Sequence, residues 1–342
     1  MGMNTLVDDV GSFPLPPKVN RDVFDKAYQR ARELILHGQT VRADAFVWEN
    51  FGKVSLEAFS KKCQTGLDVT TYPQQYDGVR QVSDVIHTAM GRGSFVVEER
   101  DAFLPEVELI KAEAATISEE VGEKIRLRVC LFGPMEQYLK EMGTVVYADV
   151  LDGFAETIRR FASNSVLNEK HVKTEVVSID EPSFGFLDAA AVREKLIEVL
   201  NTAFDFNGAV RQIHLHSSTK LADCLRVENI DVVSFEGAAS PKNVDAVSKH
   251  MLDEADKNIR VGVSRTDIDS LLAELRDKGT AIPTAEHLVE GKETIRKRFL
   301  AAKQKFGERL AFAGPDCGLG SWPSQEAALL LLKRTASAVK NA

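Results

Sequence analysis

The stretch Glu175–Pro182, EVVSIDEP, joins a run of β-branched apolar residues to an acidic end. Val176, Val177 and Ile179 favour an extended strand, and the Asp-Glu-Pro that follows marks its end. Seven further runs of this kind occur along the chain. The eight strand candidates are Leu6–Gly11, Leu67–Tyr72, Leu127–Phe132, Glu175–Asp180, Gln212–His216, Val232–Glu236, Arg260–Ser264 and Leu310–Ala313.

Amphipathic segments, with apolar residues recurring at intervals of three and four, alternate with these strands. Strand–helix alternation is typical of parallel pairing, and eight units predict an α/β fold of the (β/α)8 TIM-barrel type. A doubly wound open sheet is the alternative architecture. The clearest helical segments are Asp22–His37, Val150–Ala162, Ala190–Ala203, Thr284–Lys305 and Ser324–Lys340.

A ninth strand candidate, Ser94–Glu98, lies between the second and third strands. We expect an insertion there, as a hairpin or an extra strand, because the stretch Pro73–Arg126 is long for one barrel connection. No Gly/Ser linker, low-complexity segment or internal repeat divides the chain. Residues 1–342 are therefore predicted to form a single catalytic domain.

The charge of the chain excludes two classes of partner. The formal net charge is −8 at pH 7, with a pI near 5.5, and the Lys and Arg residues are dispersed. Binding to nucleic acid or to an anionic membrane surface needs a basic footprint. We therefore expect neither a nucleic acid nor a membrane as partner.

The apolar runs and the thiols indicate a cytoplasmic protein. The longest apolar run, Ala327–Leu332, is far shorter than the ~18 residues of a membrane span, and the N-terminus lacks the features of a secretory signal. Four cysteines, at 63, 130, 224 and 317, form no CxxC pair. Scattered thiols in a chain of this length are typical of a reducing compartment.

Polar residues gather where the predicted strands end. In a barrel of parallel strands these carboxyl ends carry the reacting groups. Period-two alternation places Ser178 with Asp180, and Ser234 with Glu236, on matching faces, and it aligns His214, His216 and Ser218. The strand ends read Gly11-Ser12, Asp180-Glu181-Pro182, His214-Leu215-His216-Ser217-Ser218, Glu236 and Asp316-Cys317-Gly318.

A histidine, a glutamate and a cysteine from three strand ends suit one zinc ion. Zinc accepts imidazole nitrogen, carboxylate oxygen and thiolate, and a catalytic zinc keeps an open position. Each residue also has a simpler interpretation. His216 could be a hydrogen-bonded structural residue, Glu236 could pair with a loop Lys or Arg, and Cys317 could be a small residue that fits a Gly-rich turn.

Five phrases in this order resemble the catalytic half of the cobalamin-independent methionine synthases: VGSFP, SIDEP, IHLH, SFEGA and GPDCGL. They run from residue 10 to residue 319 and so cover nearly the whole chain. The full-length enzymes of that family carry a second, N-terminal barrel, for which 342 residues leave no room. The chain therefore resembles the single-barrel "core" methionine synthases.

The resemblance implies a zinc ion that binds the thiol of homocysteine, with His216, Glu236 and Cys317 as ligands. The family's further ligand is a Cys two residues after the His, and this chain has Ser218 there. A hydroxyl is a poor zinc ligand at neutral pH, so this position is left to water or substrate. Cys224 would reach the ion only if its loop folded back.

The resemblance also implies how homocysteine is held. The backbone of Val10, Gly11 and Ser12 would bind the carboxylate, and Asp180 would pair with the ammonium group. Two family features are missing. The first is a carboxylate expected after the second strand, where this chain offers Asp77, with Arg80 near the expected position. The second is a proton-relaying His after the seventh strand, where the nearest titratable residue is Asp267.

The sequence therefore predicts a methyltransferase of the methionine synthase type, active in methionine biosynthesis. The core enzymes resemble users of methylcobalamin or a methylated corrinoid protein, and a net charge of −8 is unfavourable for the polyanionic tail of a folate donor. The alternatives are methyl transfer to another thiol such as coenzyme M, a uroporphyrinogen-decarboxylase-like enzyme, and a non-catalytic barrel that binds a corrinoid protein or a thiol.

Overall fold

Eight parallel strands form the centre of the molecule in the computed structural model, which describes residues 4–184, 193–280 and 282–342. The sheet order is β1-β8-β7-β6-β5-β4-β3-β2, and the parallel bridge Asp8↔Val69 joins its two ends. The predicted (β/α)8 fold is thus confirmed. The strands are β1 Leu6–Val7, β2 Thr70–Thr71, β3 Ile125–Phe132, β4 Val172–Asp180, β5 Val210–Leu215, β6 Val232–Phe235, β7 Asn258–Ser264 and β8 Leu310–Pro315.

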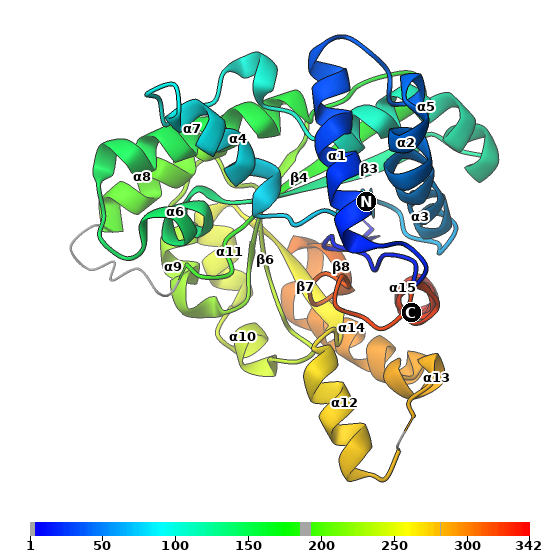
Figure 1. Cartoon of the computed structure of the whole chain (residues 1–342). Coiled ribbons are helices and arrows are strands. Elements are labelled where there is room, and N and C mark those ends of the chain that lie inside the picture. Colours follow the sequence, from blue (N-terminus) through cyan, green and yellow to red (C-terminus); the bar gives the residue numbers. More distant parts are fainter. Residues whose placement is uncertain (1–3, 185–192, 281) are drawn as a thin grey trace.

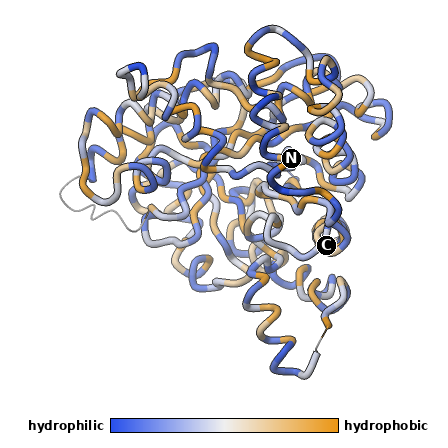
Figure 2. Tube along the Cα trace, in the orientation of Figure 1, coloured by the Kyte–Doolittle hydropathy of each residue, from blue (hydrophilic) through white to orange (hydrophobic). Residues whose placement is uncertain are grey.

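Helices surround the strands, and α12 extends away from the barrel (Figure 1). The central strands are mostly hydrophobic, whereas hydrophilic and hydrophobic residues alternate along the outer helices (Figure 2). The α-helices are α1 Arg21–Leu36, α2 Ala45–Val47, α3 Lys53–Cys63, α4 Arg80–Met90, α5 Pro105–Val121, α6 Pro134–Met142, α7 Ala148–Asn164, α8 Arg193–Ala203, α9 Leu221–Cys224, α10 Pro241–Asp245, α11 Lys249–Ala255, α12 Ile268–Asp277, α13 Ala285–Leu288, α14 Lys292–Phe306 and α15 Gln325–Lys340. A π-helix, η2 Trp48–Gly52, and four 3-10 turns, η1 Val41–Ala43, η3 Glu99–Asp101, η4 Ser218–Lys220 and η5 Gly307–Arg309, complete them.

The connection between β2 and β3 differs from the expected one. The ninth strand predicted at Ser94–Glu98 is wrong, because this segment is an irregular link between α4 and α5. Its Val97 N–H bonds to the hydroxyl of Thr157 in α7 instead of to another strand. The connection therefore holds two helices where a minimal barrel has one.

Three other predicted elements are shorter or divided. The second strand, predicted over Leu67–Tyr72, is a strand only at Thr70–Thr71. The first strand ends at Val7 instead of at residue 11, since β1 meets the segment before β2 only around Asp8. The helix expected over Thr284–Lys305 is divided into α13 and α14 by an extended residue at Val289 and by Gly291, which caps α14. The residues before Arg193 in the segment Ala190–Ala203 lie outside the described residues.

The barrel interior changes character along its axis. At the amino ends of the strands Val69, Val176, Val232 and Phe312 form an apolar cluster. The next layer toward the carboxyl ends is charged. There Asp8 accepts from two guanidinium groups that are both 0% exposed: a short hydrogen bond from Arg128 Nη1, and one of 2.7 Å from Arg260 Nε. We name Asp8, Arg128 and Arg260 the buried charge layer.

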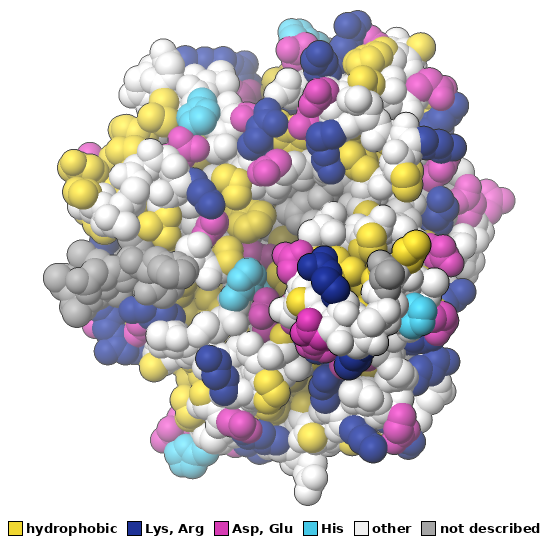
Figure 3. Space-filling view, turned by 60° about the horizontal axis from the view of Figure 1, so that its bottom comes forward, with side chains coloured by type: hydrophobic (Ala, Val, Ile, Leu, Met, Phe, Trp, Pro, Cys, Tyr) yellow, Lys and Arg dark blue, Asp and Glu magenta, His cyan; other side chains and the backbone are white. Residues whose placement is uncertain are grey.

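The surface gives no sign of a basic patch on the face that Figure 3 shows, where Lys and Arg side chains are interspersed with Asp and Glu. Of the helices described, none combines the length and the apolar character that crossing a membrane requires.

Candidate metal centre at the carboxyl rim of the barrel

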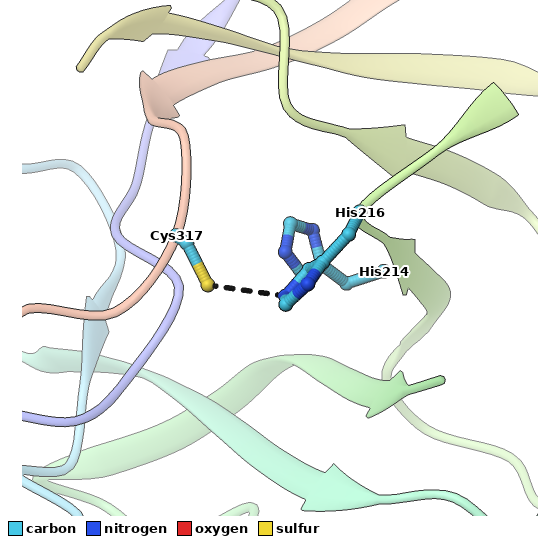
Figure 4. Close-up of side chains that lie close together, drawn as sticks. All are labelled: His214, His216 and Cys317. Carbon is cyan, nitrogen blue, oxygen red and sulfur yellow. Dashed lines mark hydrogen bonds between the residues drawn. The ribbon is translucent and has the colours of Figure 1, made fainter. Parts of the chain in front are cut away.

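Two histidines and a cysteine converge at the carboxyl ends of β5 and β8 (Figure 4). His214 lies in β5, His216 follows it, and Cys317 lies in the turn after β8. One ligand atom from each lies within 4.8 Å of the other two, and His216 Nε2 is 3.6 Å from Cys317 Sγ. Two tetrahedral ligands at the usual Zn–N and Zn–S lengths are also about 3.6 Å apart. The donor set and this separation fit zinc.

His214 is buried, with 1% of its surface exposed. Its Nδ1 lies 3.0 Å from the hydroxyl of Ser234 on β6, whereas its Nε2 is buried and has no hydrogen-bond partner. Burial, together with the nearby His216, lowers the pKa of His214 well below its usual value, so the ring is neutral at pH 7. A neutral imidazole with a free nitrogen is the form that binds metals.

Glu236 follows β6 and lies beside this cluster. Its Oε1 is 3.9 Å from His216 Nε2, and no Lys or Arg among the described residues forms an ion pair with it. Burial and the nearby Asp316 and Asp267 raise its pKa to about 7. Burial and the charges of Glu236 and Asp180 raise the pKa of Cys317 to about 12. Both groups lack a neutralising cation.

Asp180 ends β4 and points to the same rim. Its Oδ2 accepts from Cys130 Sγ at 2.9 Å, and its Oδ1 accepts from the Ser178 hydroxyl at 2.6 Å. Burial raises its pKa, and the charge of Arg128 opposes that rise. Each carboxylate oxygen keeps a free lone pair, so Asp180 could accept one more donor.

The segment after β1 contacts the turn that carries Cys317. Ser12 Oγ accepts from Gly320 N at 3.1 Å, and the Ser12 carbonyl accepts from Leu319 N at 2.7 Å. A Cβ on Gly11 would lie 2.8 Å from Gln74 Oε1, so a larger residue here would have to displace the Gln74 amide. Of the predicted carboxylate-binding residues Val10, Gly11 and Ser12, it is thus Ser12 that contacts the turn bearing Cys317, while the Ser12 N–H donates to Gln74 Oε1 at 3.3 Å.

Two side chains connect the rim loops. Asn243 Nδ2 donates to the carbonyls of His216, at 3.0 Å, and Glu236, at 2.9 Å. Asp316 accepts from three successive backbone N–H groups, those of Gly237, Ala238 and the next residue, at 2.7 to 2.9 Å. The loops after β5, β6 and β8 thus have a fixed relation to one another.

The Asp-Glu-Pro sequence serves two separate sites. Whereas Asp180 faces the rim, Glu181 accepts from the N–H groups of Met135, at 2.9 Å, and Glu136, at 2.8 Å, at the start of α6. A Cβ on Gly133 would lie 2.1 Å from Glu181 Oε1. Glu181 therefore anchors a helix instead of facing the cluster.

Ser218 and Cys224 each contact other parts of the protein. The Ser218 hydroxyl is 3.3 Å from Asn243 Oδ1, to which it donates. Cys224 ends α9, is 0% exposed and packs in the main hydrophobic core. The chain thus turns both residues toward protein groups.

Asp77, Arg80 and Asp267, named above because the resemblance lacks a match near them, bond to other residues. Asp77 accepts from Arg80 N at 2.9 Å at the start of α4, and Arg80 pairs with Asp84 at 3.4 Å. Asp267 pairs with Arg265 at 2.7 Å. These contacts are typical of helix starts and surface ion pairs.

One cavity adjoins the candidate centre, and a second lies beside Ser12. One of about 260 Å³ is lined by His216, Phe184 and Lys220, among others, and one of about 420 Å³ by Ser12, Tyr76 and others. Small polar ligands can therefore reach the predicted ligand His216 and the predicted carboxylate-binding residue Ser12.

The sequence did not assign four residues that matter here. Period-two alternation placed His214 beside His216 but gave no reason to choose it as a ligand. Cys130 lies two residues before the last residue of β3. The same period-two alternation could have identified it. Asp316 is marked in the sequence only as part of a strand end, and Asn243, from α10, has no signal in the sequence.

Comparison with known proteins supports the fold. No family model and no curated protein matches the sequence. The chain is similar in structure to a B12-independent methionine synthase from Shewanella sp. W3-18-1 in complex with selenomethionine, with a TM-score of 0.63, 12% identity and coverage of 99% of this chain and 98% of that one. It is also similar to a methyltransferase from Methanosarcina mazei, with a TM-score of 0.59, 14% identity and coverage of 99% and 94%.

Proposed function

We propose that this chain is a zinc-dependent methyltransferase that methylates the thiol of L-homocysteine to form methionine. The observation that carries the proposal is the convergence of His216 and Cys317 at 3.6 Å, with Glu236 3.9 Å from the same imidazole. These are three zinc-type donors without a Lys or Arg partner among the described residues. The two solved structures of similar fold are those of a methionine synthase and a methyltransferase.

His216, Glu236 and Cys317 would hold the ion, which when bound lowers the pKa of a substrate thiol. The rest is positioning by the chain. The free lone pairs of Asp180 suit the ammonium group of an amino acid. The carboxylate would lie at Val10–Ser12, where the Ser12 hydroxyl accepts from Gly320 N and keeps its own proton to donate. Fixing both ends of the zwitterion orients the sulfur toward the methyl group, and orientation contributes much of such catalysis.

The proposed methyl donor is methylcobalamin or a methylated corrinoid protein. The net charge of −8 disfavours a polyanionic folate tail, and the described surface in Figure 3 mixes both signs of charge. As the sulfur–carbon bond forms, the cobalt–carbon bond of the donor would break with its electron pair left on cobalt, so that the corrinoid leaves as Co(I), and the proton of the thiol would pass to solvent. The protein would act as a soluble catalyst on small molecules, in the cytoplasm.

The test is a methyl-transfer assay on zinc-loaded protein with methylcobalamin and homocysteine. We expect methionine formation with wild type and with Cys224→Ser, a change of a thiol outside the centre, and none with Cys317→Ser. Zinc is measured in each protein by mass spectrometry. Wild type that binds zinc but makes no methionine, with free or protein-bound methylcorrinoid, would contradict the proposal.

The same assay separates the alternatives. Activity with coenzyme M that survives Asp180→Asn would favour another thiol acceptor, since coenzyme M has no ammonium group. Decarboxylation without bound zinc would favour the decarboxylase reading. Methyl transfer that appears only in Ser218→Cys would favour a non-catalytic binding barrel.

A further inference from the structure

His214 is a buried side chain at the candidate centre for which the function proposed above has no use. Its Nε2 is buried without a hydrogen-bond partner. A buried imidazole nitrogen without a partner is costly, because it loses its bond to water and gains nothing in return. Figure 4 shows the ring beside His216 and facing the space near the Cys317 sulfur. The missing partner therefore belongs to that space.

The other nitrogen of the ring is already engaged. Nδ1 lies 3.0 Å from Ser234 Oγ on the neighbouring strand, where His214 and Ser234 are direct partners in the β5–β6 register. Donation of the Nδ1 proton to the hydroxyl leaves a lone pair on Nε2. Metal-binding histidines are usually oriented in this way, by a hydrogen bond from the nitrogen that does not bind the ion.

The position that the resemblance assigns to a second thiolate is filled differently. Ser218 turns its hydroxyl to Asn243 Oδ1, at 3.3 Å, and its N–H donates to the same oxygen at 3.1 Å. Its hydroxyl proton is therefore engaged by Asn243. One ligand atom from each of His214, His216 and Cys317 lies within 4.8 Å of the other two.

We infer that His214 is a zinc ligand in this chain and supplies through Nε2 the donor that Ser218 does not. The inference rests on the proposed zinc function and specifies its ligand set as two imidazoles, one thiolate and the Glu236 carboxylate. The number of protein donors then equals that of a site with a second cysteine. One negative charge is lost, because an imidazole replaces a thiolate.

The test is zinc X-ray absorption on wild type, in which multiple scattering from imidazole rings counts the bound histidines. We expect two imidazoles and one sulfur. In His214→Asn, the amide nitrogen takes the place of Nδ1 and can keep the hydrogen bond to Ser234. The asparagine has no atom in the place of Nε2. That variant should show one imidazole and bind zinc more than about 100-fold more weakly, a larger loss than outer-shell changes give.

Ser234→Ala is the matched control, since it removes the hydroxyl but leaves the imidazole. It should keep two imidazoles and weaken zinc binding by about tenfold. One imidazole and one sulfur in wild type would overturn the role of His214 and leave the proposed function standing. Failure of wild type to bind zinc, or zinc without sulfur, would instead contradict the proposed function. The wild-type spectrum decides even if a variant fails to fold.

Discussion

Two polar clusters lie at successive levels along the barrel axis. They differ in whether they contain a positively charged group. The buried charge layer holds two guanidinium groups around the single carboxylate of Asp8. The rim holds Asp180, Glu236 and Cys317, and no Lys or Arg among the described residues pairs with these two carboxylates. The lower cluster contains its own counter-ion, whereas the upper one lacks a cation.

This difference separates a structural polar cluster from a binding one. Burying a charge is tolerable when an opposite charge accompanies it, as Arg128 and Arg260 do for Asp8. Carboxyl and thiol groups whose pKa values are raised, as those of Glu236 and Cys317 are, indicate a site that is completed by a cation from outside.

The largest effect is expected in the buried charge layer. Asp8→Asn would leave two fully buried guanidinium groups without a carboxylate, and such a loss costs about 3–5 kcal/mol. We expect a fall of that size in the free energy of unfolding, measured by urea denaturation of the metal-free protein. Asp253→Asn, which breaks the exposed pairs with Lys249 and Arg309, should leave the free energy of unfolding nearly unchanged. Equal losses in both variants would remove the distinction.

At the rim, protons should compete with zinc. The pKa of Glu236 is about 7 and that of Cys317 about 12 in the metal-free protein, so both bind protons below pH 7. Zinc affinity should therefore rise about 100-fold per pH unit below 7 and about tenfold per unit above it. Chelator competition from pH 6 to 8 measures this. Glu236→Gln should give the shallower slope throughout, and an affinity independent of pH would show that these groups are not ligands.

A smaller effect should follow from loosening the rim loops. Asp316→Asn weakens the acceptor for three backbone N–H groups after Glu236, and changes to such supporting residues lower metal affinity by about 10–100-fold. The control is Asp231→Asn, which breaks a bond to Arg211 at the opposite end of the strands. Its zinc affinity should equal that of wild type. Parallel losses of zinc affinity in the two variants would indicate general destabilisation.

The smallest effect is expected at Ser218. Because its hydroxyl donates to Asn243 at 3.3 Å, Ser218→Ala removes one long hydrogen bond and no metal ligand. Zinc affinity should change by less than about threefold. A tenfold change corresponds to about 1.4 kcal/mol of binding free energy, so the expected effect is well below that. A tenfold or greater loss would place the serine hydroxyl at the ion.

The sequence predicted the barrel because strand–helix alternation is a local property that each segment carries by itself. It located His216, Glu236, Cys317 and Asp180 at strand ends for the same reason. It could not predict the charges around Asp8, since the partners are 120 and 252 residues away in the chain. Nor could it predict the free nitrogen of His214, because a missing hydrogen bond is visible only when all neighbours are in place.

The pairing of Asp180 with Glu181 has a consequence for how the chain tolerates change. Adjacent residues at the end of an extended strand point to opposite sides. One carboxylate thus enters the lumen while its neighbour holds the start of α6. A deletion of one residue within β4 would exchange the two, bringing the longer side chain inward and withdrawing the anchor of the helix. The length of β4 is therefore constrained both by the position of Asp180 in the lumen and by the contact of Glu181 with α6. A change of one residue would alter both.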